Sequence, residues 1–336
     1  MPKTVFLGTG HYVPDNIVTN DDLAARFDTS DEWIRQRTGI EERRHVDFEK
    51  EPMGSSELGA RAAKAALADA GLTKDDVDLI IYATLSPDMN FPGDGVLVQA
   101  KLDIPAGVPA LDIRNQCSGF LYGLSVADAF IKSGTYKTIL LIGAECHSTG
   151  LEFSDRGRDV TVIFGDAGAA VVLGAGADDD ERGVLGVHLH ADGRFAEELK
   201  VEYPSSRVMP RVTKDDLEEG LHFPRMNGKH VFKHAVVRMP EAVGAILEEK
   251  GLKPTDIDLL IPHQANLRIS EMVQKRLGLG DEQVFNNIQK YGNTTAASIP
   301  MALDHARRAG KVKKGDLVCF AAFGSGFTWG AALVRW

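Results

Sequence analysis

The sequence predicts an α/β protein made of two similar halves, in which helices cover largely buried sheets. A repeated string gives the first indication, because residues 71–81 and 251–261 share six of eleven positions. A repeated spacing gives the second: the stretch 117–134 opens on a cysteine and closes on a glycine, and the equally long stretch 293–310 opens on an asparagine and closes on a glycine. The third indication is the alternation of amphipathic helices with short apolar strands, which is typical of α/β layers.

Each half is expected to contain an amphipathic helix that is followed closely by a buried strand. The pairs are residues 57–70 with 79–83, and residues 236–250 with 259–262. Glycines and prolines separate the remaining apolar runs, which we interpret as further strands. These strands are expected over residues 138–143, 160–164, 169–173, 317–322 and 331–334.

The two halves are expected to join in the acidic, small-residue stretch 174–181, which divides the chain into residues 1–176 and residues 177–336. Segment 203–223 has no counterpart in the first half. It mixes prolines and a glycine with charged residues. It is therefore either a surface excursion or a cap over a pocket.

Length, charge and cysteine content exclude several classes of function. The 336 residues suffice for two fused domains, and a net charge of −10 argues against nucleic acid as the main partner, because phosphate binding needs a basic surface. The sequence shows no signal-like leader and no membrane-length apolar run, so we expect a cytoplasmic protein without membrane insertion. The three cysteines are far apart, which disfavours a zinc site and a disulfide framework.

The repeated spacing singles out Cys117 as a candidate nucleophile. A lone cysteine is more often a small buried apolar residue. Here, however, Cys117 and Asn293 open equivalent stretches, so both are expected at helix N-termini that face one site. The unpaired amides and partial positive charge of a helix N-terminus favour a thiolate over a thiol.

Two polar residues of the second half are expected to reach the same site. His263 follows the buried strand 259–262, and residues just beyond strand ends line ligand crevices in open α/β sheets. Alone it would more often be a structural histidine, but the polar string that it opens, 263–266, is unusual for packing directly after a core strand. Asn293 could be a simple helix N-cap.

A glycine-rich turn over residues 323–330 follows the apolar strand 317–322. It could be a tight turn, or an incomplete phosphate loop with no clear helix after it. It could also bring backbone N–H groups to a reacting carbonyl as an oxyanion hole.

Taken together, these strings make the chain similar to the β-ketoacyl-acyl-carrier-protein synthase III family of the thiolase-like superfamily, over nearly its whole length. The strings that carry the resemblance are residues 28–34, 37–40, 117–120, 164–170, 263–268, 292–294 and 327–330. The resemblance implies a five-layered α-β-α-β-α thiolase-like fold and a homodimer. It also implies an acyltransferase that joins an acyl-CoA primer to malonyl-acyl carrier protein, with both as substrates and with no cofactor or metal.

The resemblance assigns roles to the candidate residues. Cys117 would carry the acyl group, His263 and Asn293 would stabilise the enolate formed on decarboxylation, and the amides of Cys117 and Ser325 would form the oxyanion hole. CoA would be held by an indole and a guanidinium stacked on its adenine, with further contacts nearby. The residues implied for CoA are Thr29, Trp33, Arg37, Arg156 and Asn266.

Two further surfaces follow from the same resemblance. Phe91 matches a residue that closes the acyl pocket of the partner subunit, or it is a simple interface anchor. A basic patch would dock the acidic carrier protein, although an ordinary solvated helix face would look alike. Its residues are Lys233, Arg268, Lys275 and Arg276, of which Arg268 and Lys275 are two helical turns apart.

Three departures from the family pattern leave the primer open. The nucleophile is preceded by Arg114-Asn115-Gln116 rather than by small residues, Ser325 stands where glycine is usual, and segment 203–223 is long. The chain could thus be the initiating synthase, or a specialised relative that uses a longer acyl chain or a secondary-metabolite acceptor. A non-catalytic scaffold is disfavoured, because Cys117, His263 and Asn293 are all present.

Overall fold

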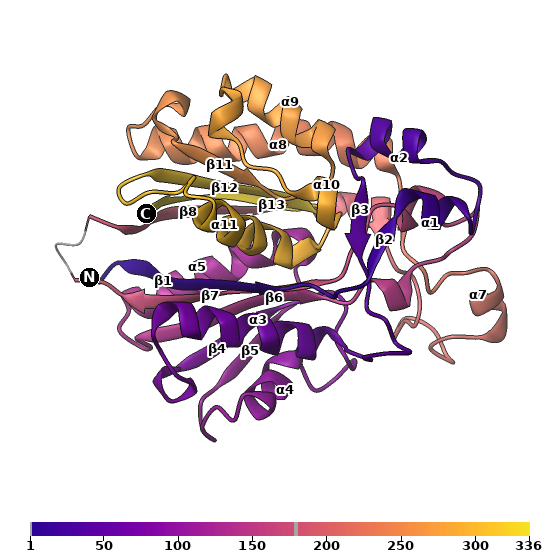
Figure 1. The fold of residues 1–336 in the computed structure, drawn as a ribbon, viewed down its shortest axis with the longest axis horizontal. Helices are drawn as coiled ribbons and strands as arrows, with labels where there is room; N and C mark the ends of the chain where they lie inside the picture. Colours follow the sequence, from indigo (N-terminus) through magenta and orange to yellow (C-terminus); the bar gives the residue numbers. More distant parts are fainter. Residues whose placement is uncertain (1, 178–180) are drawn as a thin grey trace.

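The computed structural model describes residues 2–177 and 181–336, and its layers are seen edge-on in Figure 1. The predicted junction at 174–181 lies partly outside the described residues. Two mixed sheets, each drawn from one half of the chain, form the interior. Within the described ranges, no helix combines the length and the apolar character needed to cross a bilayer.

The first sheet has the strand order β1-β7-β6-β4-β5. Its strands are β1 (Thr4–Tyr12), β4 (Leu79–Ala83), β5 (Ala110–Ile113), β6 (Thr138–Glu145) and β7 (Ala167–Ala175). The second sheet has the order β11-β12-β13-β8. Its strands are β8 (Gly183–Ala191), β11 (Leu259–Pro262), β12 (Leu317–Gly324) and β13 (Thr328–Arg335). In each sheet the short buried strand (β4 or β11) runs parallel to its neighbour (β6 or β12), which itself pairs antiparallel with the next strand.

Helices complete five layers (Figure 1). Helices α5 (Gly119–Lys132) and α11 (Ser298–Arg308) lie between the two sheets. Helices α3 (Ser55–Ala70) and α4 (Asp94–Lys101) cover the outer face of the first sheet, and α8 (Gly228–Glu249) and α9 (Leu267–Leu277) cover that of the second. The predicted α-β-α-β-α arrangement is confirmed.

The remaining elements are short and connect these layers. Two small ribbons pair β2 (Ile17–Thr19) with β3 (Glu42–Arg44), and β9 (Leu199–Lys200) with β10 (Arg225–Met226). The short α-helices are α1 (Asn20–Ala24), α2 (Asp31–Thr38), α6 (Arg158–Thr161), α7 (Lys214–Glu218) and α10 (Ile288–Tyr291). The 3₁₀ helices are η1 (Lys74–Asp76), η2 (Gln116–Ser118), η3 (Ser148–Gly150), η4 (Gly193–Glu198), η5 (Pro254–Asp256), η6 (Asp281–Gln283) and η7 (Thr295–Ala297).

The repeated string folds in the same way twice. In both halves a long helix, a 3₁₀ turn and a buried strand follow one another, as α3-η1-β4 and as α8-η5-β11. Asp78 and Asp258 occupy matching positions of the repeated string and form matching hydrogen bonds. Asp78 accepts from the amides of residues 137 and 138 at the start of β6, and Asp258 accepts from the amide of Leu317 at the start of β12. Both carboxylates therefore fix the start of the neighbouring strand.

Close packing explains the small residues of the first outer helix. Helix α3 is rich in alanine, and a Cβ on Gly8 of β1 would lie 2.6 Å from the carbonyl oxygen of Ala66. Such contact requires glycine on the strand and alanine on the helix. The inner helices bury larger groups, and the rings of Phe120 and Phe320 meet edge to face at 6.0 Å between α5 and β12.

Two expectations are changed by the structure. The strand predicted over 160–164 is wrong: Arg158–Thr161 form helix α6, and only Phe164 makes a single bridge, to Asn293. Its run of apolar residues is buried by packing against other loops rather than by a sheet. Segment 203–223 divides between the two alternatives, because its tip is a surface excursion with Met209 99% exposed, while His222 near its end lines a pocket.

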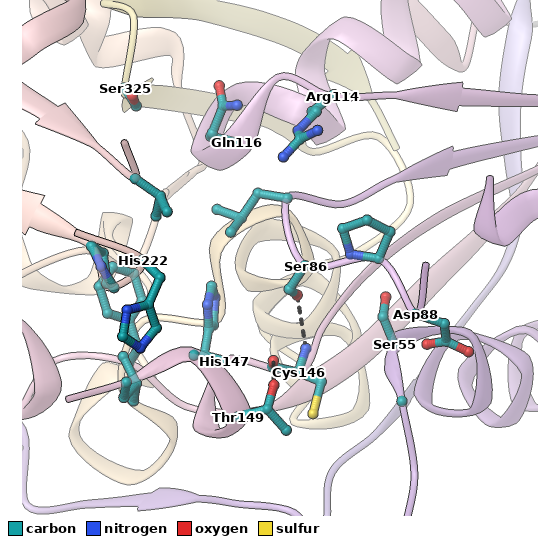
Figure 2. A pocket seen from close by; sticks show the side chains of 18 of the residues that line it. Ser55, Ser86, Asp88, Arg114, Gln116, Cys146, His147, Thr149, His222 and Ser325 are labelled. Carbon is teal, nitrogen blue, oxygen red and sulfur yellow. Dashed lines mark hydrogen bonds between the residues drawn. The ribbon is translucent and has the colours of Figure 1, made fainter. Parts of the chain in front are cut away.

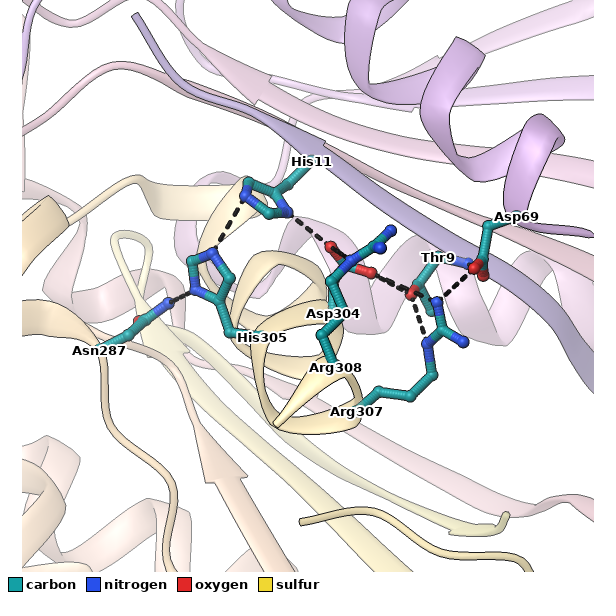
Figure 3. A network of polar contacts seen from close by, with 8 residues as sticks. All are labelled: Thr9, His11, Asp69, Asn287, Asp304, His305, Arg307 and Arg308. Atoms are coloured by element: carbon teal, nitrogen blue, oxygen red, sulfur yellow. Dashed lines mark hydrogen bonds and ion pairs between the residues drawn. The ribbon is translucent and has the colours of Figure 1, made fainter. Parts of the chain in front are cut away.

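A buried carboxylate joins the two halves (Figure 3). Asp304 of α11 is fully buried and accepts hydrogen bonds from Thr9 (2.5 Å) and from the Nε of Arg308 (2.8 Å), and it pairs with Nδ1 of His11 at 2.6 Å. Burial alone would raise the pKa of Asp304, but the bonds from His11, Arg308 and Thr9 outweigh it and hold this pKa well below its ordinary value. The charged carboxylate of Asp304 therefore links α11 to β1.

Candidate active site

A cavity of about 900 Å³ opens where the two halves meet. Its wall combines the loops after β4 and β6, the start of α5, and the turn between β12 and β13 (Figure 2). Cys117 lies in this wall together with Ser325 of the β12–β13 turn. Residues from both halves therefore line one space, although His263 and Asn293 are not among the residues that line it.

Cys117 lies in η2, immediately before α5, and is buried. Hydrogen bonding by its own amide and by the amide of Ser325 acts on the sulfur and lowers the pKa of the thiol. Burial and the nearby Glu145 act in the opposite direction and win, raising the pKa of Cys117 to about 12. Burial therefore outweighs the stabilisation of a thiolate that the helix start was expected to provide, because removing the sulfur from water opposes its charge.

His263 follows β11, and its backbone amide donates to the carbonyl of Ala321 in β12. The ring is buried, and Nδ1 lies 2.6 Å from the hydroxyl of Ser298. The other nitrogen, Nε2, is buried without a hydrogen-bond partner in the described part of the chain. Burial lowers the pKa of His263 to about 3, so the ring is neutral at physiological pH. A neutral imidazole with one free nitrogen is suited to donate one hydrogen bond to a ligand.

Asn293 is held by two hydrogen bonds. Its amide donates to the carbonyl of Ile163 at 2.8 Å, and its side-chain oxygen accepts from the amide of Thr295, two residues further along the chain, at 2.8 Å. The bond from Thr295 is of the kind that a residue at a helix start makes, so it is compatible with the N-cap alternative. It also leaves the NH₂ group as the part of the carboxamide that can donate to a ligand.

The glycine-rich turn is the tip of a hairpin. Strand β13 begins at Thr328 directly after it, so no helix follows and the phosphate-loop alternative loses its support. Ser325 Oγ donates to the carbonyl of Leu199 at 2.5 Å, so this bond uses the hydroxyl proton. A Cβ on Gly324 would lie 2.7 Å from the Cβ of Cys117. The turn therefore comes within contact of the nucleophile.

The aromatic part of the proposed CoA site is preformed on α2. The guanidinium of Arg37 lies 4.5 Å from the ring centre of Trp33, and that of Arg158 lies 4.8 Å from it. Arg156 instead pairs with Glu152 at 2.6 Å. The resemblance implies a place for Arg156 on the other side of the adenine from Trp33 and assigns no role to Arg158.

The two halves also meet next to this aromatic cluster. Asn266 caps α9 by accepting from the amide of Arg268, and its NH₂ donates to the carbonyl of Arg37 at 2.9 Å. The hydroxyl of Thr29 is buried without a hydrogen-bond partner among the described residues. Asn266 thus ties the second half to the helix that carries Trp33.

The two surface predictions fall on exposed residues. Phe91 is 82% exposed on the loop between β4 and α4. The proposed docking patch spans α8 and α9, and its members all have exposed side chains: Lys233, Arg268, Lys275 and Arg276. The guanidinium of Arg268 lies 5.7 Å from the ring of Phe232, which brings the N-terminal ends of these two helices together.

Comparison with known proteins identifies the family. Residues 111–193 match the family described as 3-oxoacyl-[acyl-carrier-protein] synthase III, and residues 247–336 match its C-terminal domain. The chain is 46% identical over 335 residues to the β-ketoacyl-[acyl-carrier-protein] synthase III of Acidiphilium cryptum, covering 100% of both chains. It belongs to the synthase III family.

Other synthase III proteins are also similar to this chain over nearly its whole length. The synthase III of Caldanaerobacter subterraneus is 47% identical, with 98% of this chain and 97% of the relative covered. The crystal structure of the Aquifex aeolicus synthase III superposes with a TM-score of 0.89 at 44% identity, covering 99% of this chain and 100% of that one. The protein is accordingly a condensing acyltransferase of the synthase III type, which initiates fatty-acid synthesis.

Two residues near Cys117 were not predicted from the sequence. His147 comes two residues after β6, is buried in the cavity wall and lies 2.8 Å from the hydroxyl of Thr295. Thr295 lies in η7, which packs against η2, and its side chain acts to lower the pKa of Cys117. The rule that singled out His263, a polar residue just beyond a buried strand, applies equally to His147 and would have found it.

Proposed function

We propose that Cys117, His263 and Asn293 divide the condensation into two steps. In the first, the Cys117 sulfur forms a bond to the acyl carbon of an acyl-CoA, the bond from that carbon to the CoA sulfur breaks, and CoA leaves with the thiol proton. In the second, malonyl-acyl carrier protein loses CO₂, and its enolate carbon attacks the acyl-Cys117. The sulfur of Cys117 then leaves and the 3-ketoacyl product is released.

The arrangement of donors around the sulfur supports this proposal best. The N–H groups of Cys117 and Ser325 both lower the pKa of the Cys117 thiol. The carbonyl oxygen of a thioester formed on this sulfur would lie close to the same two donors. In the described part of the chain, Nε2 of His263 is buried and has no partner, and the Asn293 side chain forms a hydrogen bond only through its oxygen. These two donors suit the oxygen of a developing enolate, which carries the electrons left by departing CO₂.

The test separates the two steps by variant. Cys117→Ala should form no acyl adduct in intact-protein mass spectrometry with acyl-CoAs. His263→Ala and Asn293→Ala should still form the adduct but should release CO₂ from malonyl-carrier protein about 10²–10³-fold more slowly. An adduct of normal mass on Cys117→Ala would refute the nucleophile assignment. Loss of acylation in both of the other variants would refute the division of labour.

For CoA and the carrier protein we propose separate contacts. The adenine would stack on Trp33 between guanidinium groups, with Arg37 and Arg158 already beside the ring and Arg156 within two residues of Arg158. Thr29 would offer its free hydroxyl, and Asn266 would face the pantetheine arm. The carrier protein would dock on the basic patch of Lys233, Arg268, Lys275 and Arg276.

We further propose a cytoplasmic homodimer, without nucleic acid or membrane insertion, in which the halves 1–176 and 177–336 act as one unit. The exposed Phe91 would insert at the dimer interface beside the acyl pocket of the partner. Sedimentation of the wild type and of Phe91→Ala would test this role. A wild-type monomer would contradict it.

The primer is best identified with a panel of acyl-CoAs from acetyl to palmitoyl. The structure places Arg114 and Gln116, two departures from the family pattern, in the cavity wall. A Cys117-dependent adduct from acetyl or another short donor would support an initiating role with a short primer. Adducts from long donors alone would favour the longer-chain alternative.

A further inference from the structure

His147 is placed to act on the nucleophile through one intermediate side chain. It follows β6, its ring lies 4.6 Å from that of Phe164, and it forms part of the cavity wall next to Cys146 (Figure 2). Its Nε2 lies 2.8 Å from the hydroxyl oxygen of Thr295. Burial, with smaller contributions from the nearby His45 and His263, lowers the pKa of His147 to about 3, so the ring is neutral.

Thr295 connects three functional groups at once. It is fully buried, and its amide holds the side-chain oxygen of Asn293. Its turn, η7, packs against η2, the turn that carries Cys117, and its side chain acts to lower the pKa of the Cys117 thiol. Its backbone has a φ of +49°, a left-handed conformation that is unfavourable for a β-branched residue. Such strain persists only where the surroundings fix it, and it clusters at functional sites.

Counting protons shows why the imidazole matters. A threonine hydroxyl has one proton, and a neutral imidazole has one N–H. If Nε2 of His147 is the acceptor, the Thr295 hydroxyl donates its only proton to His147. The Thr295 oxygen can then only accept a hydrogen bond from Cys117, which favours the thiol. If Nε2–H donates, the Thr295 proton is free to point at the sulfur, which favours the thiolate.

We propose that His147 is a positioning residue for acyl transfer: it donates its Nε2 proton to Thr295, so that the Thr295 hydroxyl donates to the sulfur of Cys117. The same bond stabilises the sulfur when it attacks the acyl-CoA and when it leaves in the condensation. No proton is transferred to His147 in this role. The inference rests on the proposed role of Cys117 as the nucleophile.

The proposal is tested by the reactivity of Cys117 at a single pH. The variants are His147→Leu, which removes the donor, His147→Gln, which can present an N–H at a similar reach, and Thr295→Val, which removes only the hydroxyl. Alkylation of Cys117 by iodoacetamide at pH 8, located by peptide mass spectrometry, and acylation by acyl-CoA are both measured. We expect His147→Leu and Thr295→Val to slow both reactions by roughly 10- to 100-fold, as for a lost hydrogen bond to a charged group.

Coupling and rescue distinguish positioning from general damage. The double variant of His147→Leu and Thr295→Val should be no slower than either single variant, and His147→Gln should remain within a few-fold of the wild type. In a Cys117→Ala background, adding His147→Leu should slow malonyl decarboxylation by far less than it slows acylation in the wild type, because the Thr295 amide, and not its hydroxyl, holds Asn293.

Three outcomes would overturn the proposal: wild-type rates in His147→Leu, multiplicative losses in the double variant, or an equal fall in malonyl decarboxylation. Thr295→Val provides an independent measurement if His147→Leu does not fold. If the wild type itself forms no adduct on Cys117, the proposed function fails rather than this inference.

Discussion

Replacing Gly324 with alanine is expected to slow the acylation of Cys117 by about a hundredfold while leaving the protein folded. Gly324 ends β12, and its backbone is outside the left-handed region, so alanine can adopt the same backbone conformation. The effect therefore comes from the added methyl group alone. That group would lie 2.7 Å from the Cβ of Cys117 and 3.3 Å from its sulfur.

The magnitude follows from the distance that must be recovered. Carbon atoms in contact prefer separations of about 3.5–4.0 Å, so Cys117 and the turn must move apart by roughly 1 Å. A displacement of that size at a reacting group can reduce the rate about 10²-fold. Overpacking at a buried site typically destabilises by about 1–3 kcal/mol, which a folded protein of this size can absorb.

The assay is the time course of the acyl adduct by intact-protein mass spectrometry, together with thermal unfolding of each variant. Gly244→Ala is the matched control. Gly244 lies within α8, and an added Cβ there meets no other group within 4 Å. The control should acylate normally and should be stabilised by about 0.5–1 kcal/mol, as expected for Gly→Ala in a helix. An acylation rate of Gly324→Ala within threefold of the wild type would refute the argument that the turn holds the nucleophile in place.

Three further perturbations test the electrostatics. Asp304→Asn should lower the free energy of unfolding at pH 7 by about 1–3 kcal/mol. Because the folded-state pKa of Asp304 is depressed, the ionised carboxylate stabilises the fold above the unfolded pKa of 3.8, and this stabilisation is lost at lower pH. The free energies of unfolding of the wild type and the variant, measured in urea, should therefore become equal in acid. His147 and His263 have folded-state pKa values of about 3 against an ordinary 6.5, so between these pH values the unfolded chain binds more protons than the folded chain. The free energy of unfolding of the wild type should therefore fall as the pH drops below 6.5. A free energy of unfolding that does not change with pH in this range would contradict buried, neutral histidines. Reversing charge with Arg268→Glu and Lys275→Glu should raise the KM for malonyl-carrier protein about tenfold at low salt and leave acylation by acyl-CoA unchanged, and equal changes in both steps would argue against the docking patch.

Much of the architecture could be read from the sequence because it depends on local patterns. Strands β4 and β11 are short, continuous apolar runs, and each follows an amphipathic helix at a repeated spacing. The helix starts at Cys117 and Asn293 were found in the same way. The turns that open these two helices pack against each other, because two equivalent helices, α5 and α11, lie between the same two sheets.

Other features depended on contacts between residues that are far apart in the sequence. The apolar run 160–164 has a strand-like composition, but no neighbouring strand is available to pair with it. Arg158 lies over Trp33 and Arg156 pairs with Glu152, and neither contact could be predicted from spacing along the chain.

The electrostatic state of the nucleophile was likewise decided only by the tertiary structure. The sequence by itself predicted the family and the duplicated α/β layers and singled out Cys117 as the candidate nucleophile, because these follow from local periodicity and short strings. Burial and the nearby Glu145 raise the pKa of that cysteine, and Thr295, supported by His147, opposes them. These effects arise between segments separated by up to about 180 residues, and desolvation exists only once those segments close around the sulfur.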